Sequence, residues 1–100
     1  AVTVMDDSTS IPCDIWRIAK FYAHESCGKC TPCREGNPWT VKILDRIVAG
    51  RGDQRDLAIL DDIAETMEKN SFCPLGIAAA WALQGGLKHF RPEFAALCEG

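Results

Sequence analysis

The sequence predicts an all-α fold, a small antiparallel helical bundle of four main helices plus a short C-terminal helix. From about residue 10 onward, hydrophobic residues recur at the three- and four-residue spacing of amphipathic helices. The connections between these segments are short, which favours antiparallel neighbours. A chain of 100 residues, 47% of them hydrophobic and 25% charged, has the size and composition of one ordinary globular domain.

The first helix is expected to begin at Ser10, with Pro12 tolerated in its opening turn, and to run to about Ser26. Its apolar positions fall on one stripe that should face the core: Ile11, Ile15, Ile18, Ala19 and Tyr22. In the second helix, Thr31 is the expected N-cap and Pro32 the first helical residue, which places Cys33 in the first turn. Its predicted buried face comprises Trp39, Ile43, Leu44, Ile47 and Val48.

The second helix should stop at Gly50 and Gly52. A third helix, capped by Asp53 or Asp56, should end at Asn70 and Ser71. Its expected inward positions are Leu57, Leu60, Ala64 and Met67.

A fourth helix is predicted to follow Cys73-Pro74, from Leu75 to about Leu83, and it is apolar on nearly every side. A helix of this kind is central or docked against a partner. After Gly85-Gly86, a short last helix should place its apolar residues on one side: Phe90, Phe94, Leu97 and Cys98.

The N-terminal segment reads differently from the rest. Val2 and Val4 alternate with Thr3 and Met5, a brief strand pattern that ends in turn-forming residues. We therefore predict that residues 1–9 are a remnant strand or linker from a missing upstream domain. We expect residues 10–100 to form the helical domain.

Four of the six cysteines have the spacing of a metal centre. Cys27, Cys30 and Cys33 form a CxxCxxC run, in which Gly28 can take the positive-φ geometry of a tight loop, and Cys73, followed by Pro74, comes far along the chain. This pattern is closer to a four-iron cluster than to structural zinc, which usually draws two CxxC pairs. A zinc-stapled interaction module remains the alternative, and a disulfide-rich secreted domain is disfavoured because such domains are loop-rich and core-poor.

Helix N-termini at Cys33 and Cys73 would direct free amides at the sulfurs, favouring thiolate and raising the reduction potential. Lys29 and Arg34 could add positive charge nearby. For the other candidate side chains we expect structural or solvent-exposed positions without a chemical role. These are Cys13, Cys98, His24, His89, Glu25 and Glu35, together with Trp16, Trp39 and Trp81, which we expect in the core.

Several function classes are disfavoured. A net charge of −3 without a basic cluster argues against nucleic acid, and no apolar run reaches the roughly 20 residues that span a bilayer. The chain also has no GxGxxG or GxxxxGK[ST] phosphate cradle, no nucleophile elbow and no HExxH helix. We therefore expect no catalysis by this chain alone, and no direct membrane insertion.

Three segments together resemble a known family: Glu25–Gly36 (ESCGKCTPCREG), Ser71–Leu75 (SFCPL) and Gly86–Phe90 (GLKHF). They are similar to the C-terminal 4Fe-4S domain of the NADH-binding flavoprotein subunit of respiratory complex I, the NADH:quinone oxidoreductase. Similar domains occur in diaphorase subunits of NAD-linked hydrogenases and formate dehydrogenases. The resemblance covers nearly the whole chain.

The resemblance implies one [4Fe-4S] cluster bound by Cys27, Cys30, Cys33 and Cys73. In the family this cluster relays single electrons from reduced FMN, after NADH oxidation, toward downstream clusters and quinone. FMN and NAD would bind only in the missing upstream domain, and the parent enzyme would be an NADH dehydrogenase. The implied partners are that flavin- and NADH-binding domain and other iron–sulfur subunits of the parent complex.

An intracellular location is expected, because the thiols must stay reduced during cluster assembly. The resemblance implies the peripheral arm of a membrane complex, in the bacterial cytoplasm at the inner-membrane face or in the mitochondrial matrix.

Overall fold

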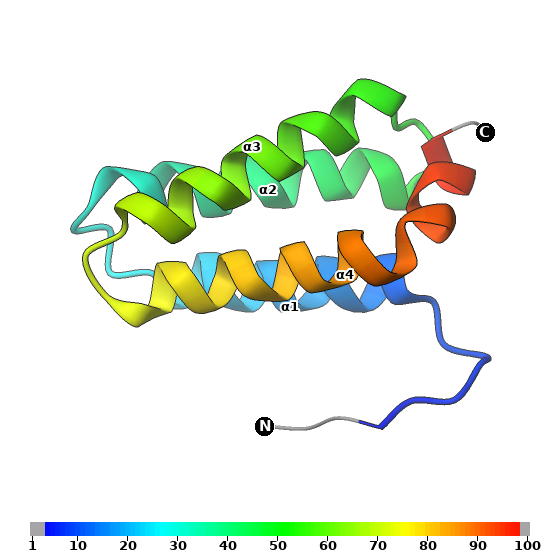
Figure 1. Cartoon of the computed structure of the whole chain (residues 1–100), viewed down its shortest axis with the longest axis horizontal. Helices are drawn as coiled ribbons and strands as arrows, with labels where there is room; N and C mark the ends of the chain where they lie inside the picture. The colour runs from blue at the N-terminus through cyan, green and yellow to red at the C-terminus, as the bar shows by residue number, and fades with distance from the viewer. Residues whose placement is uncertain (1–3, 99–100) are drawn as a thin grey trace.

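The computed structural model describes residues 4–98 as a bundle of four helices. In chain order these are α1 (Ile11–Glu25), α2 (Thr31–Val48), α3 (Gln54–Asn70) and α4 (Pro74–Cys98). α2 and α3 form one layer and α1 and α4 the other (Figure 1). The predicted all-α bundle is confirmed. Val2 and Thr3 of the predicted remnant strand lie outside the described residues, and Val4 and Met5 form no strand.

All four helices contribute to the core. Its most deeply buried side chains include Leu44, Ile47, Leu60, Met67, Leu87 and Phe94 of α2, α3 and α4, and Pro12 of α1 is buried as fully. α1 contributes Ala19, with Ile11, Ile15 and Tyr22 packed partly buried against the same cluster. The inward face predicted for α3 is confirmed, since all four of its residues are buried.

A capping box begins α3. The Asp53 carboxylate accepts a hydrogen bond from the backbone N–H of Arg55 at 3.0 Å, and Asp56 accepts one from the Asp53 N–H at 3.1 Å. Arg46 of α2 also donates to Asp56 at 2.7 Å, so this buried carboxylate ties the two helices together. Both predicted capping residues therefore contribute, Asp53 as the N-cap and Asp56 three residues later.

The break predicted at Gly85-Gly86 is not there. α4 continues through both glycines, and its non-helical residue is Phe90, with φ −129° and ψ 27°. Pro92 explains this position, because a proline inside a helix has no N–H to donate and its ring clashes with the preceding turn. Gly86 serves close packing instead, since a Cβ there would lie 2.8 Å from a side-chain carbon of Ile15.

Two of the three tryptophans predicted in the core are at the surface. Trp39 is 53% and Trp81 61% exposed, while Trp16 is partly buried. The indole N–H groups account for part of this, because each needs an acceptor. Trp81 donates to Glu68 at 2.5 Å and Trp16 donates to Asp45, so each links two helices from the rim of the bundle.

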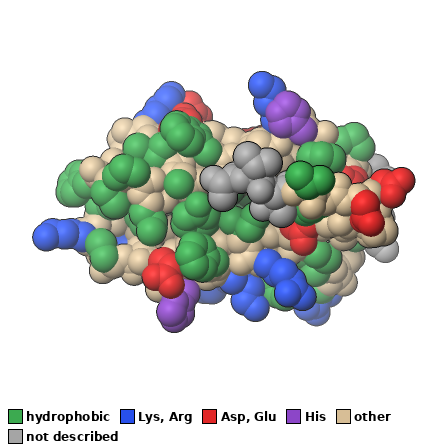
Figure 2. Space-filling view, turned by 90° about the horizontal axis from the view of Figure 1, so that it is seen from below, with side chains coloured by type: hydrophobic (Ala, Val, Ile, Leu, Met, Phe, Trp, Pro, Cys, Tyr) green, Lys and Arg blue, Asp and Glu red, His purple; other side chains and the backbone are tan. Residues whose placement is uncertain are grey.

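The face built by α1 and α4 carries many hydrophobic side chains. Figure 2 shows this face from below, with hydrophobic side chains over much of it and Lys and Arg side chains around its margins. Exposed hydrophobic side chains of these two helices include Ile18 and Phe21 of α1 and Trp81 and Phe90 of α4. Ile18, predicted to be inward, is 40% exposed.

Candidate metal centre

The two cysteine-bearing connections lie at the same end of the bundle. The α1–α2 connection, residues 26–30, and the α3–α4 connection, residues 71–73, both sit at the left end of the molecule in Figure 1. The α2–α3 connection lies at the opposite end. Up-and-down helix topology brings these two distant stretches of sequence together.

Each connection delivers its cysteines to the beginning of a helix. Cys30 is the N-cap of α2 and Cys33 lies in its first turn, while Cys73 directly precedes Pro74, the first residue of α4. The N-cap is thus Cys30 rather than the predicted Thr31, a shift of one residue. The positive ends of two helix dipoles lie beside the cysteines, as the sequence predicted.

The cysteines differ in burial. Cys30 is 8% and Cys33 5% exposed, whereas Cys27 and Cys73 are exposed. Within residues 4–98, no three Cys, His, Asp or Glu side chains stand in an arrangement for a single metal ion. The four-cysteine ligand set therefore stays a prediction from the sequence.

Contacts between the two connections centre on Cys30. Hydrogen bonding from the backbone of Phe72 is the largest influence on this thiol and lowers its pKa, against the opposing effect of burial. The backbone of Cys33 lowers the pKa further. α4 also approaches Cys33, since a Cβ built on Gly76 would lie 3.4 Å from the Cys33 Cβ. The connection before α4 is therefore packed directly against the start of α2.

Two side chains that sequence analysis did not single out contact the Cys33 sulfur. Asn37 Nδ2 lies 3.1 Å from Cys33 Sγ and 3.0 Å from the Cys33 carbonyl oxygen. Ser26 Oγ lies 3.1 Å from the same sulfur, and it accepts a hydrogen bond from Gly28 N–H at 3.3 Å. The available signal for Asn37 was its spacing, because residues four apart are neighbours on a helix surface.

Arg34 braces the cysteine segment. Its guanidinium donates to the Gly28 carbonyl oxygen at 3.0 Å and to Thr31 Oγ1 at 3.2 Å. Gly28 has φ +76°, a conformation that favours glycine, which confirms the special backbone geometry expected there. Lys29, the other predicted cation, is exposed.

The Ser71 hydroxyl is buried and has no partner at full hydrogen-bonding geometry among the described residues, although it is one of the groups that lower the pKa of Cys30. It sits in the connection before α4, and a Cβ on Gly76 would lie 2.2 Å from it. Native structures leave few buried hydroxyls unpaired, and such a group calls for an explanation such as an unseen ligand. Sulfide or thiolate sulfur could accept its hydrogen, so this end of the bundle fits an iron–sulfur group.

The remaining candidates agree with structural or surface roles. His24 is exposed and lies 3.4 Å from Glu25, and His89 is exposed. Glu35 lies 3.4 Å from Arg34, and Cys13 is partly buried without a disulfide. The side chain of Cys98 falls outside the described residues.

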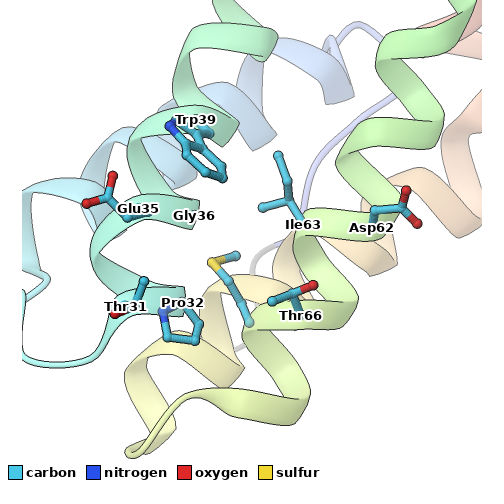
Figure 3. A pocket seen from close by; sticks show the side chains of 9 residues that line it. Thr31, Pro32, Glu35, Gly36, Trp39, Asp62, Ile63 and Thr66 are labelled. Carbon is cyan, nitrogen blue, oxygen red and sulfur yellow. The ribbon is translucent and has the colours of Figure 1, made fainter.

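An apolar groove of about 290 Å³ runs between α2 and α3 (Figure 3). Thr31 and Pro32 form its end nearest the cysteine segment, and Trp39 forms a wall. Its two carboxylates, Glu35 and Asp62, point away from one another on opposite sides.

None of the helices in the described part of the chain is long and apolar enough to cross a membrane.

Comparisons with known proteins give a consistent picture. Residues 15–97 match the family model described as the NADH-ubiquinone oxidoreductase-F iron-sulfur binding region. An NADH-quinone oxidoreductase subunit of Rhizobium meliloti is 53% identical over 93% of this chain and 21% of its own length. The mitochondrial NADH-ubiquinone oxidoreductase 51 kDa subunit of Neurospora crassa is 47% identical over 96% of this chain and 20% of its own length.

A solved structure is similar as well. An NAD⁺-reducing [NiFe]-hydrogenase in the H₂-reduced state matches with a TM-score of 0.89 and 35% identity, covering 94% of this chain and 16% of that one. The chain thus spans about a fifth of the length of the curated relatives it matches.

The family match covers the cysteine segments, both helix starts and the side chains around Cys33. It confirms the iron–sulfur cofactor and the complex I resemblance that the sequence predicted. The chain belongs to the family of NADH-ubiquinone oxidoreductase-F iron-sulfur binding regions.

Proposed function

We propose that this chain is an electron-transfer domain that holds one [4Fe-4S] cluster through Cys27, Cys30, Cys33 and Cys73. The observation that carries the proposal is the meeting of the two cysteine-bearing connections at one end of the bundle, each leading into a helix N-terminus. A bound cluster of this type supplies reversible one-electron transfer without bond-making chemistry.

At the end of the bundle where the two cysteine-bearing connections meet, the chain provides an environment that stabilises negatively charged sulfur. The N-termini of α2 and α4 present free backbone N–H groups and positive dipole ends. The lowered pKa of Cys30, caused first by hydrogen bonding from the Phe72 backbone, agrees with this arrangement, because it shifts the balance of this group toward the thiolate. Burial of Cys30 and Cys33 limits water access, a factor that tunes cluster potentials.

The proposed electron path extends beyond this chain. The relatives are named as NADH-quinone and NADH-ubiquinone oxidoreductase subunits, and one is named a flavoprotein. We infer that the parent protein oxidises NADH at FMN in its remaining sequence, and that electrons pass singly through this domain toward further clusters and quinone. The partners would be the flavin- and NADH-binding domain and neighbouring iron–sulfur subunits.

The proposed location is the peripheral arm of a membrane-bound complex. Both bacterial and mitochondrial proteins are among the relatives. The domain would accordingly operate at the cytoplasmic face of a bacterial inner membrane or in a mitochondrial matrix.

Metal and sulfide analysis after anaerobic reconstitution tests the function. We expect about four irons and four sulfides per chain and a reduced state visible by electron paramagnetic resonance (EPR). Cys73→Ser should prevent formation of the four-iron cluster, while Cys13→Ser, a matched change outside the proposed site, should leave it intact. About one zinc per chain with no reducible iron centre would instead identify a zinc-stapled module.

A further inference from the structure

The Cys33 sulfur lies within hydrogen-bonding distance of two polar side chains, those of Ser26 and Asn37. Asn37 follows one turn later on α2, and Ser26 is the residue that ends α1. We infer that Ser26 and Asn37 are positioning residues that donate two hydrogen bonds to the Cys33 thiolate and thereby raise the reduction potential of the cluster. The inference rests on the proposed function, in which Cys33 is a ligand.

The orientation of the Asn37 amide follows from its second contact. Its nitrogen is 3.0 Å from the Cys33 carbonyl oxygen, which can only accept a hydrogen bond. The same nitrogen is 3.1 Å from Cys33 Sγ. Because an amide nitrogen carries two hydrogens, one can point to the carbonyl and the other to the sulfur.

The Ser26 hydroxyl is oriented by a different constraint. Gly28 N–H donates to Ser26 Oγ at 3.3 Å, which occupies one acceptor position of that oxygen. A Cys33 thiolate has no hydrogen to donate, so across the 3.1 Å contact the hydroxyl must be the donor. The positive φ of Gly28 holds the segment in the turn that makes this contact.

The surroundings strengthen the Asn37 contact. Asn37 is 2% exposed, and the small cavity beside it is lined by apolar side chains that include Ala79 and Leu83. Hydrogen bonds in such low-dielectric surroundings are electrostatically stronger than in water. A donor here favours the more negative, reduced state of the centre over the oxidised state, which raises the potential.

The test is a redox titration of the full 100-residue chain carrying its reconstituted cluster, monitored by EPR. Asn37→Leu removes the donor while keeping a side chain of similar shape. We expect the potential to fall so that, at a fixed ambient potential, the ratio of reduced to oxidised cluster drops about tenfold, which is about 59 mV for one electron. Thr40→Val is the matched control, because Thr40 is also buried on α2 but donates to the Gly36 carbonyl oxygen rather than to sulfur.

A spectroscopic measurement separates tuning from a merely structural role. Pulsed EPR of the reduced protein in H₂O and D₂O should show exchangeable protons coupled to the cluster, and Asn37→Leu should remove one of them. Ser26→Ala should lower the potential and remove a second coupling, and Asn37→Gln should restore part of the potential lost in Asn37→Leu.

Distinct outcomes separate failure of this inference from failure of the proposed function. A wild-type chain without a four-iron cluster would overturn both. A loaded wild type whose potential and exchangeable couplings are unchanged in Ser26→Ala and Asn37→Leu would overturn the inference alone. An equal shift in Thr40→Val would also overturn it, because the effect would then not depend on the sulfur contact. If Asn37→Leu does not retain the cluster, Ser26→Ala decides by the same criteria.

Discussion

The single residue Arg34 holds the cysteine segment together through hydrogen bonds to Gly28 and Thr31. It reaches back to Gly28 and Thr31 while its own backbone lies in the first turn of α2. A planar guanidinium with several donors suits this task, whereas a lysine offers one flexible point charge. The brace fixes the loop between two proposed ligands, so it should control how firmly the cluster is held.

Replacing Arg34 with Gln should weaken this brace without unfolding the bundle, because the residue is exposed. We expect the cluster to be lost several-fold faster to an iron chelator, since the Gly28 and Thr31 contacts no longer restrain the loop. Lys29→Gln is the control, as it removes a neighbouring exposed positive charge. Loss of brown colour with time measures both rates. Equal rates in the two variants would show that charge alone, rather than the brace, matters.

The lowered pKa of Asp53 makes the stability of the fold depend on pH. Hydrogen bonding from Arg55, first from its backbone N–H, lowers the pKa of Asp53 below its ordinary value of 3.8. A carboxylate with a lowered folded-state pKa stabilises the fold above its unfolded pKa, and this contribution disappears as pH falls through the folded value.

Asp53→Asn should therefore flatten part of the acid-induced fall in thermal stability below about pH 4. Near pH 7 its effect should be small, because Asn is also a good N-cap. Thermal unfolding across this pH range, monitored by circular dichroism, measures the difference. Asp62→Asn, the same acid-to-amide change at an exposed position on the same helix, is the matched control. An unchanged slope in Asp53→Asn would contradict the linkage.

The position of helix α4 depends on a glycine in its first turn. Gly76 lies in its first turn, where a Cβ would come 2.2 Å from Ser71 Oγ and 2.7 Å from Ser71 Cβ. Only the absence of a side chain lets α4 begin so close to the connection that precedes it. The position of Cys73, between these two residues in the chain, depends on that approach.

Gly76→Ala should destabilise the fold by about 1–3 kcal/mol, because the inserted methyl displaces the Ser71 segment. It should also reduce the iron content after reconstitution. Gly85→Ala is the matched control on the same helix, where an added Cβ meets nothing within 4 Å. That change should stabilise the fold by about 0.5–1 kcal/mol through helix propensity. Urea unfolding of both variants measures the two effects, and equal effects of the same sign would refute this account.

In the whole molecule, the proposed cluster would join two helical hairpins, α1–α2 and α3–α4. Three of its ligands precede or begin α2, and the fourth precedes α4. Metal binding that requires a folded site contributes to folding stability. The contribution should be concentrated at the end where the connections meet, because the α2–α3 turn lies at the other end (Figure 1).

Hydrogen exchange of the apo and reconstituted chain should show this asymmetry. We expect increased protection at residues 26–34 and 71–76 on cluster binding. Residues 49–53 should change little. Uniform protection across the chain would mean that the cluster stabilises the bundle globally rather than locally.

Sequence patterns predicted the parts of this fold that depend on local rules. Asp53 as a cap and Cys33 in a first helical turn follow from neighbouring residues alone. Gly85-Gly86 was misinterpreted as a break, because glycine both ends helices and permits close helix contacts. Only the packed structure, with Ile15 against Gly86, distinguishes the two roles.

The candidate site was predictable in its cysteines and less so in its surroundings. The CxxCxxC spacing within the ESCGKCTPCREG block predicts three of the proposed ligands, and Cys73-Pro74 supplies the predicted fourth. The Asn37 contact depends on a side-chain orientation within α2, and the burial of Ser71 depends on how α4 approaches. The burial of Ser71 arises from tertiary packing, which residue spacing does not specify, whereas the Asn37 contact lies within one helix and had only its four-residue spacing from Cys33 as a signal.

The α2–α3 turn, where Gly50 takes a φ of +80°, has a practical consequence. A break in the chain at that turn would yield two helical hairpins, one carrying Cys27, Cys30 and Cys33 and the other carrying Cys73. Neither fragment could complete a four-cysteine site by itself. Reassembly of the two fragments would then be conditional on iron and sulfide, which would convert this bundle into a split reporter of cluster assembly.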